Sequence, residues 1–237
     1  MNCITTGPVQ RGLRQFRVGL GFTQTDLVVG LAAMLVVAAL VLIPITLHRQ
    51  KSRLTRCVGN LQQISRAVIQ FSADHSGELP NAETPRPGDL WWWYKEDIKK
   101  YAGIVEESSL NDRGFACPVD RGYTDSLPFS KNPRFDFGSY VFNGVTLRSS
   151  PNISGMKVES IHTPKRTLLV MEWTAHAPLS WHRSRTGNRN APFYSNAESV
   201  VGFVDGHVSL SPIYYDGFHA AFTRDPIPGY TYQYSGR

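Results

Sequence analysis

The 237-residue sequence lacks the spacings that mark most catalytic and cofactor sites. Its three cysteines, Cys3, Cys57 and Cys117, form neither a CxxC pair nor a zinc-finger spacing. GxxxxGK[ST] and GxGxxG are absent, which argues against a nucleotide-driven motor, and HExxH is absent as well. No serine stands in a nucleophile-elbow context. We therefore expect a protein that is not an enzyme.

Charged residues are few, and the net positive charge of the chain is modest. Charged residues make up 19%, and the formal net charge is +6. Three of the positive charges precede a long apolar run, and the next basic cluster follows that run directly: Arg11, Arg14 and Arg17 before it, and Arg49, Lys51, Arg53 and Arg56 after it. A nucleic-acid-binding face needs a basic stripe, so we expect no nucleic-acid partner.

The apolar run extends from Leu27 to Leu47 and holds 21 residues without a charge. As a helix it would be roughly 31 Å long, which matches the hydrocarbon core of a bilayer. A secretory signal peptide has a shorter apolar region and a small-x-small cleavage site, and neither is found here. We expect a single transmembrane helix.

The residues just before the run form a helix-start pattern. Thr23 is followed three residues later by Asp26, which predicts a variant capping box. Such a box supplies partners for N–H groups at the first turn of a helix, where no intrahelical acceptor exists. The Asp26 carboxylate would also face the positive end of the helix dipole.

A basic leader, Gly21-Phe22-Thr23, the acidic Asp26 and the apolar run together resemble the cleavage and methylation segment of type IV prepilins and type II secretion pseudopilins. The resemblance implies that a prepilin peptidase cuts between Gly21 and Phe22 and methylates the new amino group. Asp26 stands where this family usually has Glu. The alternative is a plain signal anchor with a capped helix.

The resemblance also implies a bacterial inner-membrane protein with one span, a cytoplasmic leader and an exported head. Basic residues on both sides of the span leave the positive-inside count equivocal. In an assembled filament, Asp26 would pair with the first amino group of a neighbouring subunit, because a lone carboxylate in lipid is costly.

The helix is predicted to continue past the membrane to about His75. One apolar stripe recurs at spacings of three and four: Leu54, Val58, Leu61, Ile64, Val68 and Phe71. Gly77 and Pro80 end it. Pro44 removes the hydrogen bond to the carbonyl of Leu40 and predicts a kink or a locally melted turn, although a harmless membrane proline is the alternative.

The remainder of the chain predicts a β-rich head. Asp205-Gly206 between two apolar segments indicates a two-residue hairpin in which Phe203 opposes Val208 and Val201 opposes Leu210. All four side chains would then face the helix. Further strands are expected within 139–147 and 167–173, and a short helix within 94–104. The fold class is α+β, pilin-like: a leader over 1–21, a long helix over 22–76 (27–47 transmembrane, 48–76 amphipathic) and a head over 77–237.

A second resemblance covers scattered parts of the head. RCVGNLQQIS around Cys57, Cys117-Pro118, YVFNG at 140–144 and FVDGHV at 203–208 are similar to prepilin-type proteins with a DUF1559 or H-X9-DG segment. Only the second half of the H-X9-DG pattern fits, since 22 residues, and not nine, separate His182 from Asp205. If the head is exported, Cys57 and Cys117 are expected to form a disulfide worth about 4 kcal/mol; the alternative is two separate thiols.

Other candidate sites lack a specific motif. Five histidines and three acids could supply metal ligands, but they lack a ligand spacing and we predict no metal site: His162, His176, His182, His207, His219, Glu172, Asp205 and Asp216. No cofactor is expected, although a structural calcium at Asp216, Gly217 and Asp225 stays open. Three successive tryptophans, Trp91 to Trp93, predict at least one at the surface, with burial at the join of helix and sheet as the alternative.

These patterns favour a prepilin-like or pseudopilin-like structural subunit that assembles through its N-terminal helix. Its expected partners are the membrane, the prepilin peptidase and other subunits. An anchored envelope binding module that never polymerises is one alternative, and an anchored metal-dependent hydrolase is another.

Overall fold

The computed structural model describes residues 21, 23–81, 90–123, 127–145, 147, 149–182, 197–218, 224–225 and 227–237. The chain divides into two units, Met1–Leu47 and His48–Arg237. Residues 1–20 of the predicted leader and Phe22 lie outside the described residues, as does His219.

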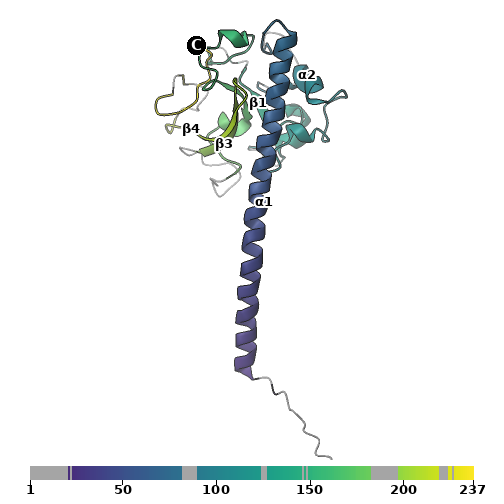
Figure 1. Cartoon of the computed structure of the whole chain (residues 1–237), viewed down its shortest axis with the longest axis vertical. Coiled ribbons are helices and arrows are strands. Elements are labelled where there is room, and N and C mark those ends of the chain that lie inside the picture. The colour runs from purple at the N-terminus through teal and green to yellow at the C-terminus, as the bar shows by residue number, and fades with distance from the viewer. Residues whose placement is uncertain are drawn as a thin grey trace, which may run out of the picture. The chain divides into compact units, whose positions relative to one another are not determined.

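The long helix predicted from the sequence is present as α1 (Gln24–Asp74) (Figure 1). It ends where two residues adopt left-handed backbone angles, Ser76 at φ 56° and Gly77 at φ 83°. The Gly77 N–H donates to the Ser72 carbonyl at 2.9 Å, which satisfies one carbonyl of the last turn. The end at Asp74 therefore agrees with the predicted boundary.

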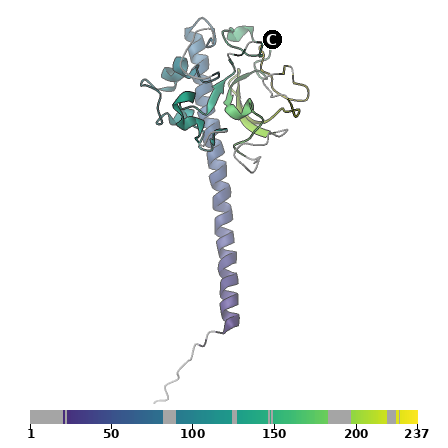
Figure 2. The same ribbon diagram turned by 180° about the vertical axis from the view of Figure 1, so that it is seen from behind.

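The head is built on one antiparallel sheet of four strands in the order β1-β2-β3-β4. The strands are β1 (Tyr140–Phe142), β2 (Leu168–Glu172), β3 (Ala197–Phe203) and β4 (Val208–Ile213). The short helix α2 (Lys95–Ile98) runs into a 3-10 turn at Lys99–Ala102. The α+β class, the two early strands and the short helix are thus confirmed. Within the head, the sheet and the α2 segment lie on opposite sides of α1 (Figures 1 and 2).

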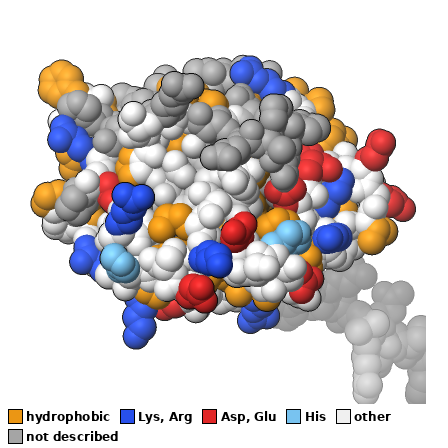
Figure 3. Space-filling model, turned by 90° about the horizontal axis from the view of Figure 1, so that it is seen from above, with side chains coloured by type: hydrophobic (Ala, Val, Ile, Leu, Met, Phe, Trp, Pro, Cys, Tyr) orange, Lys and Arg blue, Asp and Glu red, His pale blue; other side chains and the backbone are white. Residues whose placement is uncertain are grey.

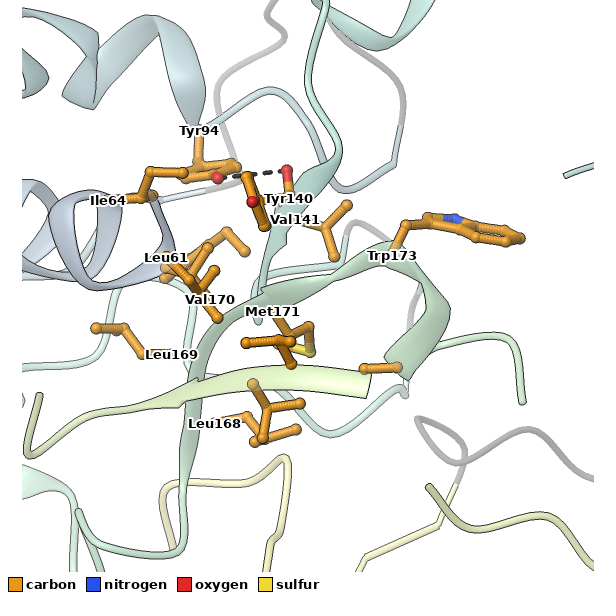
Figure 4. Close-up of a cluster of buried hydrophobic side chains, with 14 of the residues drawn as sticks. Leu61, Ile64, Tyr94, Tyr140, Val141, Leu168, Leu169, Val170, Met171 and Trp173 are labelled. Atoms are coloured by element: carbon orange, nitrogen blue, oxygen red, sulfur yellow. Dashed lines mark hydrogen bonds between the residues drawn. The ribbon is translucent and has the colours of Figure 1, made fainter. Parts of the chain in front are cut away.

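The predicted stripe of α1 packs on this sheet. Leu61, Ile64 and Val68 are fully buried. Figure 4 shows Leu61 lying beside Val170 of β2 and Ile64 lying beside Tyr94. The Tyr94 hydroxyl donates to the Tyr140 carbonyl at 3.3 Å, which ties the segment before α2 to β1. The second half of α1 is therefore a core element of the head.

The hairpin at Asp205 and Gly206 is present, but its predicted register is wrong by one residue. Val208 pairs with Gly202, and Leu210 pairs with Val200. The Gly206 N–H donates to the Phe203 carbonyl at 2.9 Å, and Gly206 has φ 91°. This left-handed residue adds one position to the turn, as in a hairpin with a glycine bulge.

The shift changes which side chains of β3 face α1. Because side chains alternate along a strand, Val201 and Phe203 cannot share a face with Val208 and Leu210 in the observed register. Gly202 lies on the face that meets α1, where an added Cβ would approach the Ser65 hydroxyl. The expectation that all four predicted residues cover the helix is therefore wrong.

The three tryptophans do not form a surface platform. Trp92 and Trp93 are 2% and 3% exposed, and Trp91 is partly buried against the core. They belong to a turn and not to a regular strand, so successive side chains need not alternate between core and solvent. The Trp92 indole N–H donates to Gly138 at 2.7 Å, and that of Trp93 donates to Gly144 at 3.0 Å. The alternative of burial therefore holds for Trp92 and Trp93, whereas Trp91 keeps part of its side chain exposed.

Candidate functional site

The first turn of α1 has the cap that the sequence predicts. The Thr23 hydroxyl and backbone N–H donate to the Asp26 carboxylate at 2.8 and 3.0 Å. The Asp26 N–H in turn donates to the Thr23 hydroxyl at 3.2 Å. This reciprocal bonding confirms the capping box. Gly21 is exposed, with open space where a Cβ would lie.

Among the residues that the structure describes, those of the apolar half of α1 are almost all exposed. Every described residue over 27–47 is exposed except Gly30, which is intermediate. Met34, Leu35 and Leu40 are each more than 70% exposed. By its length and composition, α1 could cross a membrane.

Pro44 does not interrupt this helix. Residues 24–74 form one unbroken α-helix that contains Pro44. The hydroxyl of Thr46 donates to the Ile43 carbonyl at 2.8 Å, a local bond of the kind that accommodates helix polar groups in apolar surroundings. The unbroken helix contradicts a locally melted turn at Pro44, whereas the kink stays a prediction.

Cys57 and Cys117 form the predicted disulfide. Cys57 lies on the buried face of α1, and Cys117 follows a 3-10 turn at Arg113–Phe115. The Asn60 amide donates to the carbonyls of Arg113 and Ala116, each at 3.0 Å, and so holds that turn against the helix. The Cα atoms of the two cysteines are 5.2 Å apart, which suits a disulfide.

A buried carboxylate and an imidazole lie beside this disulfide. Glu172, the last residue of β2, is fully buried, and its Oε1 atom lies 3.2 Å from Cys117 Sγ. The Nε2 atom of His182 is 2.8 Å from the same oxygen, and the side chain of His182 is only 4% exposed. The other carboxylate oxygen accepts the backbone N–H of Val200 at 2.9 Å. One sulfur, one carboxylate oxygen and one imidazole nitrogen thus meet in the interior.

These four side chains make a compact set of metal-binding groups. One donor atom from each of Cys57, Cys117, Glu172 and His182 lies within 4.8 Å of the others. In the part of the chain that the structure describes, this is the one group of at least three such residues close enough to hold a metal ion. We name it the Cys-Glu-His cluster.

The other predicted metal candidates are dispersed. His162 and His207 are exposed, and His207 contacts Asp205 of its own turn. His176 is buried and stacks on Trp91, with ring centroids 4.9 Å apart. Burial lowers the pKa of His176 to about 3, so its ring is neutral at pH 7.

The groups considered for calcium have protein partners instead. The Asp216 carboxylate accepts bonds from the Tyr214 hydroxyl at 3.0 Å and from Arg224 at 3.3 Å. The Asp225 carboxylate accepts the N–H of Tyr234 at 3.1 Å. Each carboxylate is thus oriented by donors of the chain itself.

Comparison with known proteins gives no relative. No family model, curated protein or solved structure matches this chain. We therefore infer the function from the residues of the chain itself.

The sequence offers Glu172 and His182 as metal candidates and Cys57 and Cys117 as a disulfide pair, but no motif in it connects the two sets. The available signal was Glu172 itself, a carboxylate that directly follows the apolar segment Leu168-Leu169-Val170-Met171. Burying a carboxylate in such a strand is costly unless a hydrogen-bonding or oppositely charged group lies next to it. Only the fold shows that the partner is next to the disulfide.

Proposed function

We propose that the chain is a membrane-anchored structural subunit of the prepilin and pseudopilin class. It is cut between Gly21 and Phe22, methylated on the new amino group and assembled through the first half of α1. The head occupies the exported side of a bacterial inner membrane, and the role is non-catalytic.

The observation that carries this proposal is the uncovered apolar helix directly behind the cleavage segment. A helix surface made largely of exposed Leu, Val, Ile, Ala and Met is stable only in lipid or against other apolar helices. Thr23 and Asp26 satisfy the N–H groups at its start, which suits a helix that begins at the membrane boundary.

The head supports the same role by its architecture. An amphipathic continuation of the apolar helix, packed on an antiparallel sheet, is what the resemblance implies for a pilin-like fold. The face in Figure 3 carries basic and acidic side chains interspersed with small apolar areas. Such a surface lacks the single-sign field that nucleic-acid binding needs on that face.

The deciding experiment is mass spectrometry of the protein extracted from membranes that contain a prepilin peptidase. The expected product starts at methylated Phe22 and has 216 residues, which is 237 minus 21. Gly21→Val should leave the full-length chain, whereas Gly19→Val, two residues earlier, should still be cut. A mature N-terminus elsewhere overturns the proposal.

Assembly is tested separately by crosslinking in native membranes. Asp26→Asn should keep cleavage but lose the ladder of crosslinked subunits, because the neutral amide cannot pair with a neighbour's amino group. Asp74→Asn, at the other end of α1, is the matched control and should keep the ladder. A correctly cleaved wild-type chain that stays monomeric would instead favour an anchored binding module.

A further inference from the structure

The Cys-Glu-His cluster contains ionisable side chains that a purely structural disulfide does not need. The Oε1 atom of Glu172 lies 3.2 Å from Cys117 Sγ. The sulfur of a disulfide carries no proton, so it cannot donate a hydrogen bond to this oxygen. A fully buried carboxylate is costly, and β2 could have ended on an apolar residue at this position. The disulfide alone therefore does not explain Glu172.

His182 does not complete the explanation either. Its Nε2 atom bonds the same carboxylate oxygen that faces the sulfur, so imidazole, carboxylate and sulfur converge on one point. If the pair served only to neutralise a buried charge, either carboxylate oxygen would do. The oxygen that His182 uses is the one directed at the cysteines.

We propose that the cluster is a redox-dependent zinc site. In the oxidised chain, Cys57 and Cys117 form the disulfide. When a dithiol reductant supplies two electrons and two protons, the disulfide becomes two thiols and the reductant becomes a disulfide. One Zn²⁺ then binds, the two thiols release their protons to solvent, and four bonds form: two from thiolate sulfurs, one from His182 and one from Glu172.

The donor set and its dimensions suit this ion. Structural zinc is tetrahedral, with bonds of about 2.3 Å to sulfur and about 2.0–2.2 Å to nitrogen and carboxylate oxygen, so its four ligand atoms lie about 3.3–3.8 Å apart. The four donor atoms here already lie within 4.8 Å of one another. Thiolates with imidazole select zinc over the hard ions magnesium and calcium.

Neighbouring groups are placed to hold the ligands once the ion is bound. The Glu172 oxygen that does not face the sulfurs accepts from the Val200 N–H at 2.9 Å and from the Ser199 hydroxyl at 3.4 Å. The Cys117 N–H donates to the Ser139 hydroxyl at 2.9 Å, and that hydroxyl donates to Asp120 at 2.7 Å. Contacts of this kind orient metal ligands and raise affinity.

The test uses the full chain in detergent, prepared oxidised and, after treatment with a dithiol under anaerobic conditions, reduced. The reduced chain should bind one Zn²⁺ per molecule by elemental analysis after gel filtration, and Co²⁺ in its place should show sulfur-to-cobalt charge-transfer absorption. The oxidised chain should bind neither ion. His182→Ala and Glu172→Gln should each weaken zinc binding by at least roughly 10–100-fold.

His162→Ala is the matched control, because His162 is an exposed histidine outside the cluster, and it should bind zinc as the wild type does. Circular dichroism accompanies each sample. A reduced chain that unfolds and refolds on adding zinc supports the site. A reduced chain that binds no stoichiometric zinc, folded or unfolded, overturns it. So does equal loss of binding in His162→Ala, or equal binding by the oxidised chain.

Discussion

At the scale of single residues, Gly202 sets how closely β3 can approach α1. A Cβ built on Gly202 would lie 2.8 Å from the Ser65 hydroxyl and 3.1 Å from the Val170 carbonyl. Real side chains do not tolerate such a contact without movement, and Ser65 is itself buried. The missing side chain thus allows the helix and sheet to pack.

We expect Gly202→Ala to lower the free energy of unfolding by about 1–3 kcal/mol through overpacking. Denaturant unfolding of the detergent-solubilised chain, followed by tryptophan fluorescence, measures the loss. The control is Gly59→Ala on the exposed side of α1, where a Cβ meets nothing within 4 Å. That change should stabilise by roughly 0.5–1 kcal/mol because alanine favours the helix. Equal effects of the two substitutions would contradict the packing argument.

A buried ionic group near α2 is a second feature at this scale. Lys95 is 1% exposed and bonds the Asp112 carboxylate at 2.8 Å and the Asp136 carbonyl. The Asp136 carboxylate itself is farther from the ammonium, at 4.0 Å. Burial raises the pKa of Asp136 to about 6, and Lys95 only partly opposes this shift. Ionised Asp136 is therefore costly to the folded state.

The stability that Asp136 contributes is full below pH 3.8, its ordinary pKa, and is lost as the pH rises through about 6. We expect Asp136→Asn to stabilise the chain above pH 7 by up to about 3 kcal/mol and to have little effect at pH 3.5. Asparagine also tolerates the left-handed φ of 48° at this position. Unfolding curves across this pH range test the prediction, with Glu159→Gln at an exposed site as the control. A stability difference that does not vary with pH would refute it.

At the scale of elements, the β3–β4 hairpin shows how one backbone angle fixes a whole strand. The sequence correctly located the turn at Asp205 and Gly206, but an Asp-Gly pair is compatible with both a two-residue loop and a loop with a bulge. The left-handed Gly206 selects the bulge, and every side chain of β4 follows from that choice.

We expect Gly206→Val to cost about 1–2 kcal/mol or more, because a branched side chain is strained at φ 91°. Gly206→Asn should cost less, since asparagine enters the left-handed region more readily. Open space surrounds the Gly206 Cβ position, so sterics with neighbours cannot produce this ranking. Thermal unfolding of both variants measures it, and an Asn variant at least as unstable as the Val variant would count against a backbone origin.

At the scale of the whole molecule, the chain consists of two units whose apolar side chains differ in exposure. The unit after Leu47 contains the disulfide, the sheet and the buried stripe of α1. The unit before it exposes apolar side chains along its helix. The unit that begins at His48 therefore has a core of its own, whereas the unit that ends at Leu47 needs an apolar environment.

We expect residues 48–237 expressed alone to be soluble and to unfold cooperatively, while the full chain sediments with membranes. Fractionation followed by denaturant unfolding checks both statements. Retention of the shortened chain in the membrane fraction, or a non-cooperative melt, would show that the division at Leu47 and His48 does not separate the folding core from the anchor.

The Cys-Glu-His cluster also belongs to this scale, because four separate segments build it. Its members come from α1, from the segment after Arg113–Phe115, from the end of β2 and from the residues before β3. No local spacing encodes such a site, and the cysteines are 60 residues apart. Only the sheet and the packed helix bring the four side chains together.

The sequence by itself determined the features that depend on local periodicity and local hydrogen bonding. These are the long helix, its Thr23–Asp26 cap, its end near Gly77, the early strands and the antiparallel α+β class. Tertiary structure alone decided the register of β4, the burial of Trp92 and Trp93 and the meeting of Glu172 with the disulfide. The physical reason is that these outcomes depend on which distant surfaces pack together, and hydrophobic packing is non-directional until the backbone fixes the geometry.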